Sequence, residues 1–362
     1  MDNTSATKIA NFEYFDEEFP TEKAALEYWE KIKWNGHPVC PKCRSFKVSK
    51  WRDDRPGWYR CKKCRKEFTA RHDTIFACTK IPLRTWFKAW YNMVQHGGIS
   101  MRLAEDIGVV QETAWFMTHR IREAMRTHKE DMMLGGPGII LEIDETYPGG
   151  LERFKHCDKR LFPGGGPGGK KGGVSLVERG DNGRRITIKL PVKWVKNKKG
   201  KKIKTPYLSK KMARDIVLRY IKPGTVVVTD TAEVYDILKG LGYSHFTVNH
   251  KRHQYAKKED SPLIKKSYTN SVESSHKEVK TRHRNYVHYS RKHEQRYYDE
   301  TDFKWNQCRK FKEKDGTLVF AKRRSPTVKA FNDFLRGCLG KTLSYKQLTG
   351  KYRNRKKRRK AR

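Results

Sequence analysis

Two apolar stretches that lie far apart in this 362-residue sequence each end at an aspartate. Asp144 follows the run GPGIILEI, and Asp230 ends the run TVVVTD. A charge in a buried strand is costly unless it is paired or binds a metal, so each aspartate is a candidate metal ligand. The alternative is an edge strand whose acids, Glu142 and Glu145 included, all face water.

A third carboxylate, Glu273, lies in NSVESSHKEVK, which is typical of the start of a helix with Asn270 as its N-cap. Seven residues separate Glu273 from Lys280, so the two share a helix face. The alternative is a solvated ion-pair face. Two strand-end aspartates and a helical glutamate, in the order strand–hairpin–helix–strand–helix, predict the metal site of a ribonuclease-H-like fold with a mixed sheet.

Such a cluster suits phosphoryl transfer to or from DNA. Two Mg²⁺ ions would clamp the attacking and leaving oxygens, and hard carboxylate oxygens suit Mg²⁺ or Mn²⁺. Asp144, Asp230 and Glu273 would hold these catalytic ions, and Lys280 would hold a phosphate near the cut.

Two CxxC pairs, separated by 17 residues, predict a second metal site. Its ligands would be Cys40, Cys43, Cys61 and Cys64. Two such turns joined by a hairpin converge on one tetrahedral zinc, which we expect to be structural. A thioredoxin-like redox pair is the alternative, but the βαβ context that it needs is absent. The remaining four cysteines are scattered and are expected to be reduced thiols.

Between these two sites, residues 80–134 have the apolar periodicity of helices. A short helix, a turn at Gly108 and a second helix with a polar start are typical of a helix-turn-helix unit. The residues expected to contact DNA are Gln111, Thr113, His119, Arg120 and Arg122. A pair of ordinary core helices is the alternative.

The charge balance points to a polyanionic partner. Lys and Arg number 81 against 40 acids, a net charge of +41. Nucleic acid is the usual partner of such a chain, and an anionic membrane surface is the rival. There is no apolar run of ~18 residues and no signal peptide. We therefore expect a protein that binds double-stranded DNA, with no membrane partner. It would be cytoplasmic and nucleoid-associated in a bacterium, or nuclear in a eukaryote.

The rest of the pattern predicts further elements and the domain boundaries. Strands are expected over 173–178, 185–190 and 245–250, helices over 208–220, 232–241 and 297–305, and a solvated polybasic loop over 193–204. The domains would be an N-terminal helix (1–36), a zinc ribbon (37–79), a helix-turn-helix-like segment (80–134), a catalytic domain (135–310) and a basic extension (311–362). Residues 351–362 carry nine Lys or Arg and form a phosphate-binding, localisation or solubilising tail.

Several of these motifs, in this order, resemble the zinc-ribbon DDE transposases of Merlin-related, ISXO-type insertion sequences. The similar segments run from about Phe19 to Asn306, and they are FPTEKAALEYWEKIKW with CPKC, YRCKKCRKEFTARHDTIF, EIDETYPGG, VVVTD, FTVNH, TNSVES…K and KHEQRYYDETDFKWN. The resemblance implies that Asp144, Asp230 and Glu273 are the acidic triad and that Lys280 is the following basic residue. It also implies that the four CxxC cysteines bind the ribbon zinc.

The sequence departs from the family pattern at two positions. Tyr268 replaces a usual histidine and His276 a common tryptophan; some members use asparagine as the third ligand, which makes Asn270 a competitor of Glu273. The resemblance implies a transposase that binds terminal inverted repeats, cuts there and joins the ends to target DNA, as a homodimer on DNA. The alternatives are a DNA-binding regulator or domesticated descendant that no longer cuts, and a repair nuclease acting on branched DNA.

Overall fold

The computed structural model describes residues 12–350 apart from 52–53, 127–131, 151, 163–165, 181–182, 198–199, 250–251, 253, 255, 287, 309–310, 315–316 and 321–325. These residues form two compact units. The N-terminal unit takes its residues from 1–127 and 307–362, and the sheet unit takes its residues from 128–306. The predicted basic tail, 351–362, lies outside the described residues.

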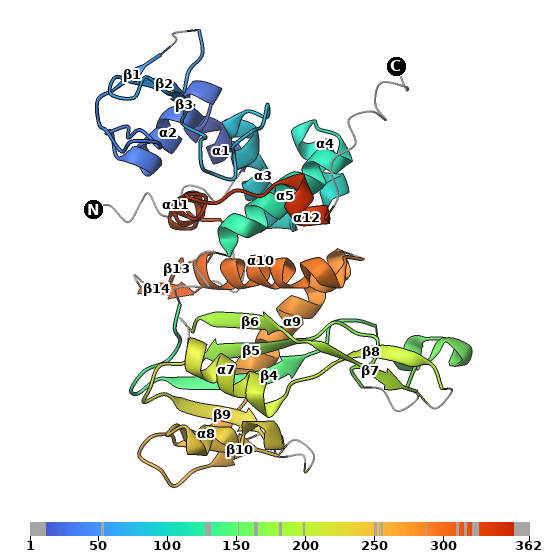
Figure 1. Ribbon diagram of the computed structural model, residues 1–362. Helices are drawn as coiled ribbons and strands as arrows, with labels where there is room; N and C mark the ends of the chain where they lie inside the picture. Colours follow the sequence, from blue (N-terminus) through green and yellow to red (C-terminus); the bar gives the residue numbers. More distant parts are fainter. Residues whose placement is uncertain are drawn as a thin grey trace. The chain divides into compact units, whose positions relative to one another are not determined.

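The N-terminal unit combines a small antiparallel sheet with helices (Figure 1). The strands are β1 (Val48–Lys50), β2 (Trp58–Cys61) and β3 (Glu67–Thr69). The helices are α1 (Phe12–Glu18), α2 (Glu22–Trp34), α3 (Leu83–His96), α4 (Ser100–Ile107), α5 (Gln111–Met125), α11 (Val328–Gly337) and α12 (Tyr345–Thr349). A separate hairpin pairs β13 (Phe311–Lys314) with β14 (Thr317–Phe320).

Two neighbouring residues hold the starts of two helices: Thr21 caps α2, and Glu22, the first residue of α2, contacts the start of α3. The Thr21 hydroxyl accepts a hydrogen bond from the Ala24 amide at 3.2 Å and so caps α2. Helix α3 has no side-chain cap of its own. The Glu22 carboxylate instead accepts hydrogen bonds from the Leu83 and Arg84 amides at 2.8 and 2.9 Å, where the helix dipole also favours a negative charge.

The segment after residue 326 does not form the separate basic extension that the sequence suggested. Helix α11 buries one aromatic face in the N-terminal unit. The ring of Phe331 lies 4.9 Å from Phe87 and 5.0 Å from Trp90, and Phe334 stacks on Trp90 at 5.4 Å. The expected boundary is therefore wrong for 326–350, because burial of this aromatic face outweighs the basic composition of the segment.

The sheet unit is built on five strands that lie side by side in the order β10-β9-β4-β5-β6 (Figure 1). Their bounds are β4 (Ile140–Thr146), β5 (Gly173–Glu178), β6 (Arg185–Lys189), β9 (Val226–Asp230) and β10 (Ser244–Val248). The pairs β4–β5 and β5–β6 are antiparallel, whereas β4–β9 and β9–β10 are parallel. The expected mixed sheet is thus confirmed.

Alternate residues of β4 face different helices. Leu141 and Ile143 join a core that includes Ile216 and Val217 of α7 (Lys210–Tyr220). Glu142, on the other side of the strand, hydrogen-bonds the start of α9 (Asn270–Asn285), which packs against β4 and β5. The sheet therefore lies between α7 and α9, and the period-two pattern of β4 decides which side chains face each helix.

Helix α10 (Glu294–Gln307) covers the edge strand β6 with polar side chains rather than apolar ones. Alternate amides of β6 donate to one face of α10: Arg185 to Asn306 (2.7 Å), Thr187 to Asp302 (2.6 Å) and Lys189 to Gln295 (2.7 Å). The side-chain amides of Asn306 and Gln295 donate back to carbonyls of the same strand. The backbone groups of the edge strand are thereby satisfied.

Most of the remaining elements agree with the sequence pattern, but three differ. The expected loop over 193–204 is largely a hairpin of β7 (Val192–Lys196) and β8 (Lys202–Pro206). The helix expected over 232–241 is broken into η5 (Glu233–Tyr235) and α8 (Ile237–Gly240). Helix α9 begins at Asn270 after the N-cap residue Thr269, so Asn270 is not the cap. A short pair, β11 (Ala256–Lys258) with β12 (Lys266–Tyr268), precedes α9.

None of the helices in the described ranges is long and apolar enough to cross a membrane.

We expect Asp302→Ala to lower the free energy of unfolding by about 3 kcal/mol or more. The change leaves the fully buried Arg185 guanidinium without the carboxylate that accepts its Nε–H at 2.8 Å, and it leaves the Thr187 amide unsatisfied. Urea denaturation of the full chain, followed by circular dichroism, measures this loss. Asp215→Ala, an exposed acid on α7, should change stability by less than about 0.5 kcal/mol. Equal effects of the two variants would contradict the role of Asp302.

Candidate functional site

The predicted strand-end aspartates meet at one end of the sheet. In the parallel pair β4–β9, Ile140 is opposite Val226 and Glu142 is opposite Val228, a constant offset. The same offset brings Asp144 level with Asp230 on the neighbouring strand. Strands in a sheet lie about 4.8 Å apart, so adjacent strand ends bring the two carboxylates within reach of one ion.

Glu145 adds a third carboxylate to this pair. Oxygen atoms of Asp144, Glu145 and Asp230 all lie within 4.8 Å of one another. The hydroxyl of buried Tyr235, in η5, donates a hydrogen bond of 2.6 Å to Glu145 Oε1. One Asp230 oxygen accepts the Ala232 amide at 3.0 Å. Asp144 Oδ1 accepts the Glu145 amide at 2.8 Å, so each acid is held by its own local contact while the cluster remains partly open to solvent.

The cluster concentrates negative charge in a partly buried position. Burial and the neighbouring carboxylates of Glu145, Asp230 and Glu273 raise the pKa of Asp144 to about 7. Burial also raises the pKa of Glu145, although the hydrogen bond from Tyr235 opposes it. Repulsion among carboxylates at this separation is the electrostatic signature of a cation site.

Helix α9 carries His276 and Glu273 one turn apart beside this cluster, although Glu273 is exposed and lies outside the group of oxygens within 4.8 Å of one another. Thr269 donates a hydrogen bond of 3.0 Å to Glu273 Oε1. His276 Nδ1 lies 3.6 Å from Asp144 Oδ2, and burial, with nearby Lys280 and Arg185, lowers the pKa of the imidazole to about 3. The ring is therefore neutral and packs against Asp144 without forming an ion pair. Lys280 lies further along α9 with its side chain exposed.

Glu142 is a structural anchor rather than a metal ligand. Its fully buried carboxylate accepts hydrogen bonds from Arg179 Nε at 2.9 Å, the Ser271 hydroxyl at 3.1 Å and the Val272 amide at 2.9 Å. Arg179 also donates to the carbonyls of Lys266 and Tyr268, the first and last residues of β12. These contacts fix the first turn of α9, and with it Glu273, against β4.

The residues present fit a divalent metal. The donor set consists of carboxylate oxygens alone, which suits Mg²⁺ or Mn²⁺, and a cation would relieve the repulsion that raises the pKa of Asp144. Asp144, Glu145 and Asp230 would provide the ligands from the sheet, and Glu273 would approach from α9.

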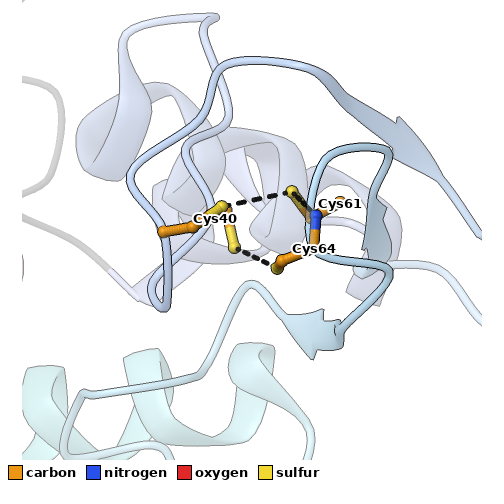
Figure 2. Close-up of side chains that lie close together, drawn as sticks. Cys40, Cys61 and Cys64 are labelled. Atoms are coloured by element: carbon orange, nitrogen blue, oxygen red, sulfur yellow. Dashed lines mark hydrogen bonds between the residues drawn. The ribbon is translucent and has the colours of Figure 1, made fainter.

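The four predicted zinc ligands converge in the N-terminal unit. Cys40 Sγ lies 3.6 Å from Cys64 Sγ, and Cys43 Sγ lies 3.5 Å from Cys61 Sγ. Figure 2 shows the labelled side chains of Cys40, Cys61 and Cys64 close together. Thiolates about 2.3 Å from a tetrahedral zinc would be roughly 3.8 Å apart, so the cluster has the size of a zinc site. The Cys64 amide donates to Cys61 Sγ and lowers the pKa of Cys61 to about 6, which favours the metal-binding thiolate.

The two CxxC turns have the same backbone geometry. In each, the residue after the second cysteine has a positive φ, 59° at Arg44 and 55° at Arg65. The amides of these two arginines donate to the carbonyls of Cys40 and Cys61, at 3.0 and 2.9 Å. Two matching turns therefore aim four thiols at one point.

The five residues expected to contact DNA all lie in α5, and they fall into an exposed group at its start and a buried group further along. Gly108 ends α4 in the left-handed conformation, φ +67°, and α5 begins three residues later. At the start of α5, Gln111 is exposed and Thr113 partly exposed. These two positions are open to a partner.

The expectation is wrong for His119, Arg120 and Arg122, which are buried. Arg120 donates to the carbonyls of Ile75, Ala77 and Leu343, and Arg122 donates to the Thr118 hydroxyl and the Gly98 carbonyl. Both guanidiniums are used to satisfy backbone and hydroxyl groups inside the N-terminal unit.

The residues that sequence reasoning did not assign to the site are Glu145, Tyr235, Arg179 and His276. Glu145 was considered only as one of the acids that would face water on an edge strand, and its place next to Asp144 at the strand end was the signal that could have assigned it to the site. His276 is three residues after Glu273 and so shares its helix face. For Arg179 and Tyr235 the sequence offered no signal, because their partners are distant in the chain.

Comparison with known proteins finds one matching family model within each unit. Residues 133–306 match the ISXO2-like transposase domain, and residues 20–67 match the transposase zinc-ribbon domain. A protein described as an uncharacterized protein in transposable element ISH50, from Halobacterium salinarum, is 30% identical over 133 residues. That match covers 36% of this chain and 42% of the relative, less than half of either. The resemblance seen in the sequence is confirmed.

We expect Mg²⁺ to raise the melting temperature of the full chain by several degrees. Ligand at 100 times its Kd stabilises a protein by about 2.7 kcal/mol, or roughly 5–10 °C for a unit of this size. Because the folded-state pKa of Asp144 is raised, the metal-free protein loses stability as pH rises from about 4 to 7, and the Mg²⁺ effect should grow over the same range. Differential scanning fluorimetry at several pH values measures both. Asp144→Asn should remove the Mg²⁺ effect and Asp215→Asn should keep it; an unchanged effect in Asp144→Asn would refute the site.

We expect the purified chain to hold about one zinc, and Cys61→Ser to lose it, because tetrahedral thiolate sites do not tolerate a missing ligand. Elemental mass spectrometry of the dialysed protein measures the ratio. Cys78→Ser changes an exposed cysteine outside the cluster and should retain the metal. Equal zinc content in the two variants would show that the four cysteines do not form the site.

Proposed function

We propose that this chain, with matches to the ISXO2-like transposase domain and the transposase zinc-ribbon domain, is a transposase. It would bind the terminal inverted repeats of its insertion sequence and catalyse metal-dependent DNA cleavage and strand transfer to target DNA. The observation that carries the proposal is the convergence of Asp144, Glu145 and Asp230 at the end of the sheet, beside the helix that bears Glu273. The element order strand–hairpin–helix–strand–helix, from β4 to α9, supports a ribonuclease-H-like domain.

The bound ions would activate a water or a 3′-hydroxyl and stabilise the departing oxygen. The protein's own residues prepare the site for this. Tyr235 holds Glu145 in place, the neutral His276 packs against Asp144 from the side of α9, and Glu142 fixes the first turn that carries Glu273. Lys280, two turns further along α9, would hold a phosphate of the bound strand.

DNA recognition would use both units. In the N-terminal unit, we assign α4 and α5 to a helix-turn-helix in which Gln111 and Thr113 reach the bases. Gln111 Nε2 donates to the Ser100 hydroxyl at 2.9 Å, so its position at the start of α5 is defined. The zinc ribbon adds a basic surface. Because strand transfer joins two element ends, we expect two protomers on DNA.

We expect Asp230→Asn to abolish cleavage of duplex DNA taken from the flanks of this gene, by more than about 100-fold, with binding changed by less than about threefold. The amide removes a charged ligand but keeps the shape of the side chain. Gel analysis of labelled duplexes with Mg²⁺ or Mn²⁺ measures the cuts. Asp215→Asn is the matched control and should cut normally.

The third ligand is tested in the same assay. Glu273→Gln should lose cleavage as Asp230→Asn does, whereas Asn270→Ala should retain it if Glu273 is the ligand. Normal cleavage by Asp230→Asn would exclude the proposed active site. Tight DNA binding without cuts, in wild type and with both metals, would instead support a DNA-binding regulator that no longer cleaves.

A further inference from the structure

The hairpin β7–β8 is a basic arm at the end of the sheet that carries the carboxylates. The antiparallel registers align Asp144 with Ser175 and Ser175 with Thr187, and β7 begins five residues after Thr187. Strand β6 lies two strands from β4, about 10 Å away. The two strands of the arm leave the end of the sheet together in Figure 1.

One face of the arm is anchored. Ile203 and Thr205 are buried, the Gly169 amide donates to the Lys204 carbonyl at 3.0 Å, and the Asn197 side-chain amide donates to the Leu161 carbonyl at 3.2 Å. The segment before β5 thus supports the hairpin along its length. The arm is a fixed feature of the sheet unit and not the solvated loop that its composition suggested.

The opposite face is exposed, aromatic and cationic. By the cross-strand register, Trp194 is opposite Lys204 and Lys196 is opposite Lys202, and all four side chains are exposed. Trp194 is 64% exposed, with Lys204 Nζ 5.0 Å from its ring centroid. The stretch 192–206 holds seven lysines and no acid. In the described part of the chain, no carboxylate forms an ion pair with the three lysines of this face.

Lysines that alternate with an exposed aromatic side chain fit nucleic acid better than any other polyanion. The ammonium groups neutralise phosphates, and an exposed indole offers a stacking surface to any base that is not paired. DNA that reaches the carboxylates would pass within about one helical turn of the arm, because a turn of duplex spans about 34 Å. Strand cleavage also creates DNA ends at which bases can leave the stack.

We propose that the outer face of β7–β8 binds the DNA held at the carboxylates, with Lys196, Lys202 and Lys204 on phosphates and Trp194 stacked on an unpaired base beside the cut. This inference rests on the proposed transposase function and adds a second DNA-contact surface to it, outside the helical segment. Binding, rather than cleavage, is therefore the quantity to measure.

The test uses the full chain in the Asp230→Asn background, without divalent metal, so that no DNA is cut. Fluorescence anisotropy gives Kd from 50 to 200 mM salt for a blunt flank duplex and for the same duplex with three unpaired 3′ nucleotides. The triple variant Lys196→Gln, Lys202→Gln, Lys204→Gln should bind both DNAs more than tenfold more weakly at 100 mM salt. Its slope of log affinity against log salt should fall by up to about 2.7.

A matched triple, Lys222→Gln, Lys239→Gln, Lys265→Gln, removes the same charge from exposed positions elsewhere on the sheet unit. It should change Kd by less than about threefold. Trp194→Ala should weaken binding to the duplex with unpaired nucleotides by about 5- to 100-fold and to the blunt duplex by less than twofold, and Trp194→Phe should restore most of the loss.

Equal Kd values for the two lysine triples would overturn the assignment of the arm to DNA. An equal effect of Trp194→Ala on both duplexes would overturn the stacking contact. Loss of binding to phosphatidylserine vesicles, with DNA binding intact in the arm variants, would assign the arm to a membrane surface instead. If the Asp230→Asn protein binds no DNA, both the assignment of the arm and the proposed function are wrong. Normal cutting by Asp230→Asn in the cleavage assay with metal would instead exclude only the proposed active site.

Discussion

The buried ion pair between Glu142 and Arg179 is the interaction on which the geometry of the carboxylate site depends. It lies within the sheet unit at a position where an isolated charge would be strongly unfavourable. Both oxygens of the Glu142 carboxylate accept hydrogen bonds there. By accepting the first-turn amide of α9, Glu142 sets the height and rotation of that helix. The distance from Glu273 to the strand-end acids follows from this contact, although Glu142 itself never faces the metal.

The N-terminal unit uses the same device. Glu22 of α2 accepts the first amides of α3, as Glu142 of β4 accepts an amide of α9. In both cases a carboxylate from one element caps a helix that has no side-chain cap of its own, and so couples the positions of two elements. A charge placed at a helix start is favoured by the dipole and by the unsatisfied amides together. Rigid placement of functional side chains thus rests on polar contacts as much as on apolar packing.

Local pattern predicted the sheet strands, the zinc ligands and two of the carboxylates, because each depends on residues close together in the chain. Asp144 and Asp230 could be found from the ends of apolar runs, and the cysteines from their spacing. The arginines of α5 were misassigned because composition cannot tell an exposed guanidinium from one that donates to buried carbonyls. The roles of Tyr235 and Arg179 depend on partners 37 to 90 residues away, and these contacts exist only in the folded chain. The many lysines and arginines likewise led to the prediction of a loop where β7–β8 forms a hairpin, and of a basic extension where α11 is buried.

The side chains of α10 have a consequence for how two copies of the chain could associate. Asn306, Asp302 and Gln295 occupy the outward amides of β6, so this edge offers no free ladder of donors to another strand. A second copy therefore cannot extend the sheet at β6 by adding a strand of its own. A pairing of protomers through strand addition is thus ruled out at this edge, two strands from β4, and two copies of the chain would have to associate through other surfaces.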